Sequence, residues 1–195
     1  MARTSSGRID RRALLGGLAA LGVTAPVSAQ QAGMSGRTAH SFSFAGLEGS
    51  DIMMSSFAGR PVLVVNTASF CGFSSQLGGL QALWSRLSPR GFALLGVPSN
   101  DFGGQEPGPP AETAQIARSH GVQFPLAAKA RVVGPEAHPF YRWAATERPR
   151  ETPRWNFHKY LVGIDGGIVA VFPTSTDPLD ARITVAVERE LARRS

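Results

Sequence analysis

The sequence predicts an α/β fold, and three consecutive segments carry that prediction. Residues 61–65 form a short apolar run, mostly β-branched, which is typical of a buried strand. Within residues 77–87, apolar side chains recur every three or four positions, as on the inward face of an amphipathic helix. Residues 92–97 are a second apolar run. A strand, a helix and a strand in this order predict two parallel strands joined by a right-handed crossover.

The other segments place further elements on both sides of this unit. Residues 30–40 are small and polar and indicate a flexible mature N-terminus, so we place the folded domain at residues 41–195. The elements expected within that domain are a hairpin (41–44 with 51–54), a long Gly/Pro loop (98–110), a helix (111–120), a modest strand near 124–127, a helix (134–143), a linker (144–154), a hairpin (155–164 with 168–172) and a last helix from 176.

Composition excludes several classes of protein. A hydrophobic content of 43% with 17% charged residues is that of a globular chain rather than a disordered one. The net charge is +6, of which residues 1–29 carry +3 (four Arg and one Asp), leaving +3 for the rest. That mild excess, without a basic cluster, argues against nucleic-acid binding. The single cysteine excludes an intramolecular disulfide, a Cys-x-x-Cys redox pair and a cysteine-rich metal site.

Residues 1–29 have the pattern of an export signal. Arg11-Arg12 precedes an apolar stretch over 13–23 that is too short to span a bilayer, and Val27-Ser28-Ala29 is a small-x-small cleavage site. The arginine pair resembles a twin-arginine signal, although Asp10 stands where Ser or Thr is usual. A Sec signal with a chance arginine pair, or an uncleaved anchor, are the alternatives. We expect a periplasmic protein that begins at Gln30.

The only cysteine, Cys71, lies between the first predicted strand and the helix that follows it. The free N–H groups and the dipole at the start of a helix favour an anion, so a thiolate is expected to be stabilised there. A buried, inert cysteine is the alternative. The loop over 98–110 leaves the carboxyl end of the neighbouring parallel strand. Because such loops gather at one edge of the sheet, we expect Gln105 to lie near Cys71.

Three separated motifs resemble the signatures of the glutathione peroxidase family. They are Asn-Thr-Ala-Ser-Phe-Cys-Gly (66–72), Pro-Ser-Asn-Asp-Phe-Gly-Gly-Gln-Glu-Pro-Gly (98–108) and Trp-Asn-Phe-His-Lys-Tyr-Leu-Val (155–162), with a weaker fourth match at 134–141. They follow the family's order and spacing over most of residues 42–180. The resemblance implies a thioredoxin-like fold, with a central mixed β-sheet flanked by helices. It also implies a peroxidase whose active residues are Cys71, Gln105, Trp155 and Asn156.

These residue types suit the reduction of a hydroperoxide. A thiolate attacks the outer peroxide oxygen and becomes a sulfenic acid, while amide and indole N–H groups from Gln105, Asn156 and Trp155 can steady the developing charge. Taken singly, each of the three has a structural alternative: satisfying loop backbone, filling the core, or forming a turn. Glu106 is expected to fix its loop rather than to act as an acid.

We expect no cofactor and no metal. The four histidines (His40, His120, His138 and His158) lack metal-ligand spacing, and we take His138 and His158 as structural or exposed.

The sequence departs from the family pattern in ways that bear on its partners. Ser74 stands where Thr is usual, and residues 114–122 lack the second, resolving cysteine of many members. We therefore expect an external reductant, either glutathione or a thioredoxin-type protein. The linker 144–154 is short, which favours a monomer, and no membrane anchoring is expected once the signal is removed. Thiol–disulfide exchange is disfavoured because one cysteine cannot cycle alone. The remaining alternative is a peroxide sensor that relays oxidation to a partner protein.

Overall fold

A computed structural model describes residues 36–194, so the predicted export signal at 1–29 lies outside the described residues. Four strands form the central sheet in the order β4-β3-β5-β6: β3 (Val62–Thr67), β4 (Ala93–Pro98), β5 (Lys159–Val162) and β6 (Ile168–Phe172). β3 and β4 are parallel, whereas β5 runs antiparallel to both β3 and β6. The expected mixed sheet is confirmed, and β3 and β4 are the parallel pair that the sequence predicted.

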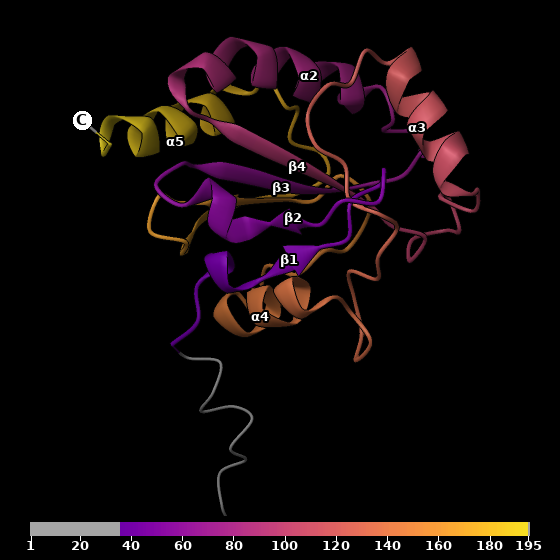
Figure 1. The fold of residues 1–195 in the computed structure, drawn as a ribbon, viewed down its shortest axis with the longest axis horizontal. Helices are drawn as coiled ribbons and strands as arrows, with labels where there is room; N and C mark the ends of the chain where they lie inside the picture. Colours follow the sequence, from indigo (N-terminus) through magenta and orange to yellow (C-terminus); the bar gives the residue numbers. More distant parts are fainter. Residues whose placement is uncertain (1–35, 195) are drawn as a thin grey trace, which may run out of the picture.

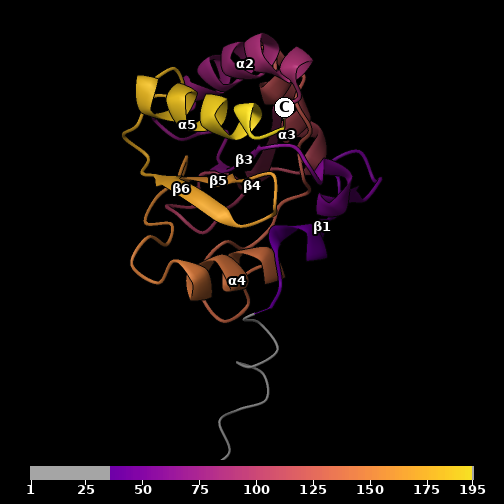
Figure 2. The same ribbon diagram turned by 90° about the vertical axis from the view of Figure 1, so that its left-hand side faces the viewer.

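Helices cover both faces of this sheet (Figures 1 and 2). On one face lie α2 (Gln76–Leu87), which continues into the short helix η3 (Ser88–Arg90), and α5 (Ala181–Ala192). On the other face lies α4 (Pro139–Glu147), together with the N-terminal elements η1 (Ala39–Ser41), β1 (Ser43–Phe44), β2 (Ile52–Met53) and η2 (Met54–Phe57). The remaining helix, α3 (Pro110–Ser119), packs at the side of the molecule.

The strand β3 is buried on both faces, which explains why its sequence is continuously apolar rather than alternating. Val62 and Val64 belong to the hydrophobic cluster on the α4 side, where Trp143 is the largest side chain. Leu63 and Val65 belong to the cluster beneath α2 and α5. Cys71 is a member of this second cluster, so the sulfur is anchored in the core that α2 builds.

Several predicted elements differ from the structure, and three of them lie outside the candidate site. Residues 124–127 form only isolated bridges, Gly96 with Leu126 and Gly46 with Ala127, instead of a strand. The helix expected from 134 begins at Pro139, since the ring nitrogen of His138 caps it by accepting the backbone N–H of Phe140. The last helix begins at 181, after Asp180 caps the backbone N–H of residue 182.

The sequence places the start of the folded domain at residue 41, but in the structure residues 37–40 already pack against it. The indole N–H of Trp143 donates to the carbonyl of Arg37 at 3.1 Å, and the backbone N–H of Ala39 donates to Gly166 at 2.8 Å. Ala39 is fully buried. Residues 37–40 therefore pack against α4 and the β5–β6 turn. None of the helices in residues 36–194 is long and apolar enough to cross a membrane.

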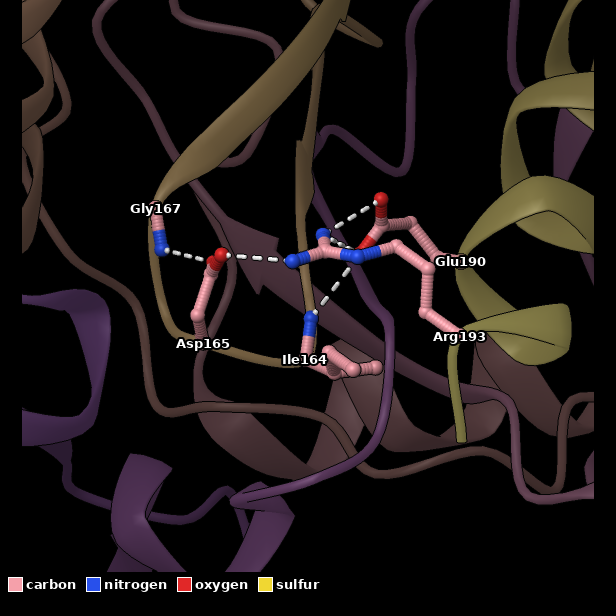
Figure 3. A network of polar contacts seen from close by, with 5 residues as sticks. All are labelled: Ile164, Asp165, Gly167, Glu190 and Arg193. Carbon is pink, nitrogen blue, oxygen red and sulfur yellow. Dashed lines mark hydrogen bonds and ion pairs between the residues drawn. The ribbon is translucent and has the colours of Figure 1, made fainter. Parts of the chain in front are cut away.

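A network of charges fastens the β5–β6 turn to α5 (Figure 3). Arg193 pairs with Asp165 at 3.0 Å and with Glu190 at 2.8 Å. Glu190 also accepts the backbone N–H of Ile164 at 3.1 Å. The backbone N–H of Gly167 donates to Asp165, and this bond together with Arg193 holds the pKa of Asp165 below its ordinary value. Each carboxylate in the network therefore has both a guanidinium and an amide partner.

Candidate active site

Cys71 lies in a series of turns between β3 and α2. Its side chain is only 3% exposed. The backbone N–H of Phe73 points at the sulfur, with 3.5 Å between N and Sγ, and the backbone N–H of Ser74 donates to the Cys71 carbonyl. Because α2 begins only at Gln76, an amide of the turn, rather than the end of the helix, contacts the sulfur. This contact provides the N–H donor that the sequence had led us to expect from the helix end.

Gln105 lies beside the cysteine turn, as the sequence predicted. The backbone N–H of Phe70, the residue before Cys71, donates to the carbonyl of Gln105 at 3.0 Å. This bond joins the loop that leaves β3 to the loop that leaves β4. The two loops follow the carboxyl ends of parallel strands, which is why they meet at the same edge of the sheet.

A buried carboxylate fixes this pair of loops. Glu106 is 2% exposed, and it accepts hydrogen bonds from the backbone N–H of Ser69 (2.6 Å), from the Ser69 hydroxyl (3.0 Å) and from the hydroxyl of Thr113 (2.5 Å). The backbone N–H of Glu106 donates to the Asn100 side chain at 2.8 Å. These contacts engage both carboxylate oxygens, so Glu106 holds the loops together, as its loop-fixing interpretation predicted.

The side chain of Asn156 reaches the same loop and orients Gln105. Its Nδ2 donates to the carbonyl of Phe102 at 3.3 Å and to Oε1 of Gln105 at 3.0 Å. A backbone carbonyl can only accept, so the nitrogen side of the Asn156 amide must face it. Gln105 therefore presents its oxygen to Asn156 and keeps its NH₂ group as the free donor. Both N–H groups of Asn156 are occupied, so this residue positions Gln105 instead of donating to the sulfur itself.

Trp155 forms one wall of the site. Its ring packs against that of Phe102, with 5.9 Å between centroids, and a Cβ at Gly103 would be 3.5 Å from the indole. The Trp155 carbonyl accepts a hydrogen bond from Nδ2 of Asn66 at 3.1 Å, which fixes the backbone to the end of β3. The side chain is 39% exposed. The structure therefore brings Gln105, Trp155 and Asn156 into contact around one loop, and it ties that loop to the cysteine turn.

The segment that carries Trp155 and Asn156 turns sharply before β5 begins. The hairpin was expected from residue 155, but the strand starts at Lys159 because Phe157 has a φ of 63°, in the left-handed region. The backbone N–H of Phe157 donates to the Asn66 carbonyl at 2.6 Å, and Nζ of Lys159 donates to the Phe157 carbonyl at 2.7 Å. The left-handed turn directs residues 155 and 156 toward the loop of Gln105.

Comparison with known proteins agrees with this geometry. Residues 39–145 match the family described as Glutathione peroxidase. The chain belongs to the glutathione peroxidase family. A hydroperoxy fatty acid reductase, gpx1 of Synechocystis sp., is 40% identical to it over 151 residues, which cover 72% of this chain and 89% of the relative.

Two further proteins are similar. The glutathione peroxidase-like peroxiredoxin gpx1 of Schizosaccharomyces pombe is 40% identical over 67% of this chain and 85% of its own length. The crystal structure of Trgpx in apo form superposes with a TM-score of 0.66 at 29% identity, covering 80% of this chain and 97% of Trgpx. The thioredoxin-like fold implied by the resemblance is confirmed, and the protein is an enzyme of the peroxidase type.

Three large aromatic side chains on the segments of the candidate site are exposed. Phe70 is 54% exposed and Phe73 is 40% exposed, and both lie within two residues of Cys71 in the chain. Trp155 is the third. We call these three residues the aromatic rim (Phe70, Phe73 and Trp155).

Two histidines of this glutathione peroxidase, His138 and His158, have structural contacts. Among residues 36–194 no three His, Cys, Asp or Glu side chains are grouped so as to hold a metal ion. The Nε2 of His138 donates to the Ser43 carbonyl at 2.9 Å while its ring stacks on Phe44, and burial lowers its pKa. His158 is buried against Tyr160, and burial, reinforced by the charge of Lys159, lowers its pKa to about 4.

Three residues that hold the site together were not identified from the sequence: Asn66, Phe157 and Lys159. Asn66 and Lys159 depart from the pattern around them, and those departures were the available signal, whereas Phe157 gives none. Asn66 is a polar residue at the end of an apolar strand, and it is fully buried. Lys159 is a charged residue at the start of an apolar hairpin, and it is also fully buried. Buried polar groups of this kind need partners, and here the partners are backbone groups of the site.

Proposed function

We propose that this protein is an exported, single-cysteine peroxidase that reduces organic hydroperoxides at Cys71, with Gln105, Trp155 and Asn156 as the other site residues. One observation carries the proposal. The hydrogen bonds from Phe70 to Gln105, and from Asn156 to Gln105, join three loops at the edge of the sheet where the only cysteine lies. The free NH₂ group of Gln105 and the indole N–H of Trp155 are then the donors for the leaving oxygen.

The oxidation step transfers one oxygen atom to sulfur. The Cys71 thiolate attacks the outer oxygen of the hydroperoxide, an S–O bond forms and the O–O bond breaks. The cysteine is oxidised to a sulfenic acid, and the peroxide is reduced to an alkoxide that takes up a proton and leaves as an alcohol. Each N–H donor aimed at the departing oxygen contributes on the order of 3 kcal/mol to lowering the barrier.

An external thiol must complete the cycle, since the chain has one cysteine. A first thiol condenses with the sulfenic acid, releasing water and forming a mixed disulfide, and a second thiol releases the Cys71 thiol as the external disulfide forms. Arg150 and Arg154 line a cavity of about 370 Å³ together with Glu151, on the segment that leads to Trp155 in the chain, and guanidinium groups pair well with carboxylates. This supports glutathione as the reductant over a thioredoxin-type protein.

The aromatic rim supports an apolar hydroperoxide as the preferred substrate. Three exposed rings on the segments of the candidate site suit a hydrocarbon chain better than they suit hydrogen peroxide. The name of the Synechocystis relative, a hydroperoxy fatty acid reductase, points the same way. We therefore propose fatty acid hydroperoxides as the substrate class.

Stopped-flow kinetics on the mature protein test this function. Mixing the reduced enzyme with a fatty acid hydroperoxide, with cumene hydroperoxide or with hydrogen peroxide should give second-order oxidation that is fastest for the fatty acid. Added glutathione should then produce a mass increase of one glutathione at Cys71, and excess glutathione should restore the thiol. If neither glutathione nor a thioredoxin-type protein reduces the oxidised form, the peroxide-sensor alternative is the better function.

Export and a monomeric state are part of the same proposal. Cleavage after Ala29 should leave Gln30 as the N-terminus in the periplasmic fraction, which mass spectrometry can identify. Replacing Arg11 and Arg12 by Lys should block export by the twin-arginine route, and unaffected export would indicate the Sec route. Sedimentation at micromolar concentration should give a monomer, and a stable tetramer would contradict that state.

A further inference from the structure

Lys159 is a charged group that the reaction does not use, and it is buried with a backbone carbonyl as its partner. It is the first residue of β5 and is fully buried. Its Nζ donates to the carbonyl of Phe157, two residues earlier, at 2.7 Å. Burial lowers the pKa of Lys159 to about 8, although the carboxylate of Asp177 acts in the opposite direction. Removing a lysine from water is costly, so this side chain is a poor source of stability.

The carbonyl that Lys159 holds belongs to a strained residue. Among residues 36–194, Phe157 alone has a positive φ without being glycine, and its side chain is fully buried. A bulky residue adopts the left-handed region only where its surroundings enforce it. Both backbone polar groups of Phe157 are fixed, the N–H by the carbonyl of Asn66 and the carbonyl by Lys159.

The strained turn decides where the site residues point. Trp155 and Asn156 come directly before Phe157, and their direction is set by its backbone angles. Asn156 must place its amide within reach of both Phe102 and Gln105, and those bonds leave the Gln105 NH₂ group free to donate. A relaxed, extended Phe157 would rotate the preceding residues away from the Gln105 loop.

We propose that Lys159 is a positioning residue of the peroxidase, which acts by holding Phe157 in its left-handed conformation and thereby placing Trp155 and Asn156 at the site. This inference rests on the proposed function of those two residues and of Cys71. It predicts that removing the ammonium group slows the oxidation of Cys71 without a loss of stability.

The test compares Lys159→Met with a matched control. The control is Lys129→Met, which removes the other lysine of the chain, an exposed side chain whose Nζ also donates to backbone carbonyls, those of Pro107 and Gly108. Stopped-flow oxidation of Cys71 by one hydroperoxide at pH 7 should be about tenfold slower in Lys159→Met and within twofold of wild type in the control. The urea midpoint of Lys159→Met should equal or exceed that of the wild-type protein.

A Lys159→Met variant that oxidises at the wild-type rate overturns the inference, and so does one that is slow only because it has lost stability. If Lys159→Met does not fold, Lys159→Gln replaces it, because glutamine keeps a polar end but lacks the length of lysine; the same slowing is expected. The proposed function fails in a different way, through a wild-type protein whose Cys71 does not react with peroxide at all.

Coupling to Trp155 and Asn156 provides a readout that a general structural role would not change. In an Asn156→Ala, Trp155→Phe background the site residues no longer need positioning, so adding Lys159→Met should slow oxidation by less than twofold. A full tenfold effect in that background would mean that Lys159 acts by another route and would overturn the inference. The emission of Trp155, obtained by subtracting the spectrum of Trp155→Phe, should shift in Lys159→Met and stay unchanged in Lys129→Met.

Discussion

The two ends of the central sheet differ in how fully their buried polar groups are hydrogen-bonded. At the β5–β6 turn, the carboxylates of Asp165 and Glu190 are shared between Arg193 and backbone amides (Figure 3). The end where β3 and β4 finish, the catalytic end, carries the candidate site. Most of the buried side-chain polar atoms that lack a hydrogen-bond partner in residues 36–194 lie there: Asn66 Oδ1, Gln76 Oε1, Asn156 Oδ1 and His158 Nε2. The two other such atoms are His40 Nε2 and Tyr141 OH.

Each unpartnered buried polar atom costs about 1–3 kcal/mol, so the difference between the ends is a difference in stability as well as in chemistry. At the β5–β6 turn, Asp165 and Glu190 each find two kinds of donor, although His40 Nε2 beside that turn has no partner. At the candidate site, Asn66, Gln76 and Asn156 are each fixed in direction by the bonded nitrogen of the amide while the oxygen stays unpaired. The candidate site therefore holds its amides in place at the expense of unpaired oxygens.

The largest expected effect comes from removing the nucleophile at the catalytic end. Cys71→Ser should lower the rate of peroxide consumption by at least about 10³-fold, because a hydroxyl is far too weak an acid to replace the thiolate. The melting temperature should change by only a few degrees, since the two side chains are nearly equal in size. Peroxide consumption by this variant at more than a hundredth of the wild-type rate would mean that another group reacts.

Acid should destabilise the catalytic end through His158. Between pH 6.5 and about 4 the unfolded chain binds a proton at this ring and the folded chain does not, so stability falls as the pH falls through that window. Within this window, each pH unit changes the free energy of unfolding by about 1.4 kcal/mol, so the total loss of stability approaches about 3 kcal/mol.

Urea unfolding at pH 7 and at pH 4.5 measures this loss. His158→Phe should remove a large part of the difference between the two conditions, and His138, whose pKa burial also lowers, should account for part of the remainder. His120→Phe, at a residue distant from the site motifs in the chain, should keep the difference. Equal pH dependence in His158→Phe and in the wild-type protein would show that the ring is not the source.

The orientation of Gln105 by Asn156 should appear as strong coupling. Gln105→Ala and Asn156→Ala should each slow the oxidation of Cys71 by about 10- to 100-fold. Because Asn156 acts through Gln105, the double variant should be little slower than Gln105→Ala alone. Additive effects in stopped-flow oxidation would instead mean that Asn156 contacts the reacting atoms. Trp155→Phe should slow oxidation by a similar factor and should add to the effect of Gln105→Ala.

The smallest effect on catalysis is expected at the opposite end. Arg193→Met removes the shared partner of Asp165 and Glu190. It should lower the urea midpoint only slightly, since Arg193 is exposed and Glu190 keeps its bond to the Ile164 amide. Oxidation of Cys71 should stay within twofold of wild type. A slowing of tenfold would show that the two ends are not independent.

The sequence predicted best the elements that depend on local patterns. The apolar run of β3, the stripe of α2 and the Asp165-Gly166-Gly167 turn are visible without any knowledge of distant contacts. The start of β5 was missed because the conformation of Phe157 is imposed by Asn66, a residue far away in the chain. The start of α4 was missed because the capping group is a histidine, which does not belong to the usual capping residues.

The sequence proposes the residues of the candidate site but not the hydrogen bonds among them. Cys71, Gln105, Trp155 and Asn156 came from motifs, and the structure brings the last three together. Which half of the Asn156 amide faces Gln105 depends on the Phe102 carbonyl, whose direction only the folded loop defines. The contact of the sulfur with the Phe73 amide likewise depends on a turn that ends before α2 begins.

Because Cys71 is buried, we expect the site to limit the size of the molecules that can reach the sulfur. With 3% of the residue exposed, only a narrow group at the end of a chain can reach the sulfur, and a hydroperoxide is such a group. Bulky electrophiles such as maleimides should therefore alkylate the resting enzyme only slowly, because a buried sulfur offers them little access.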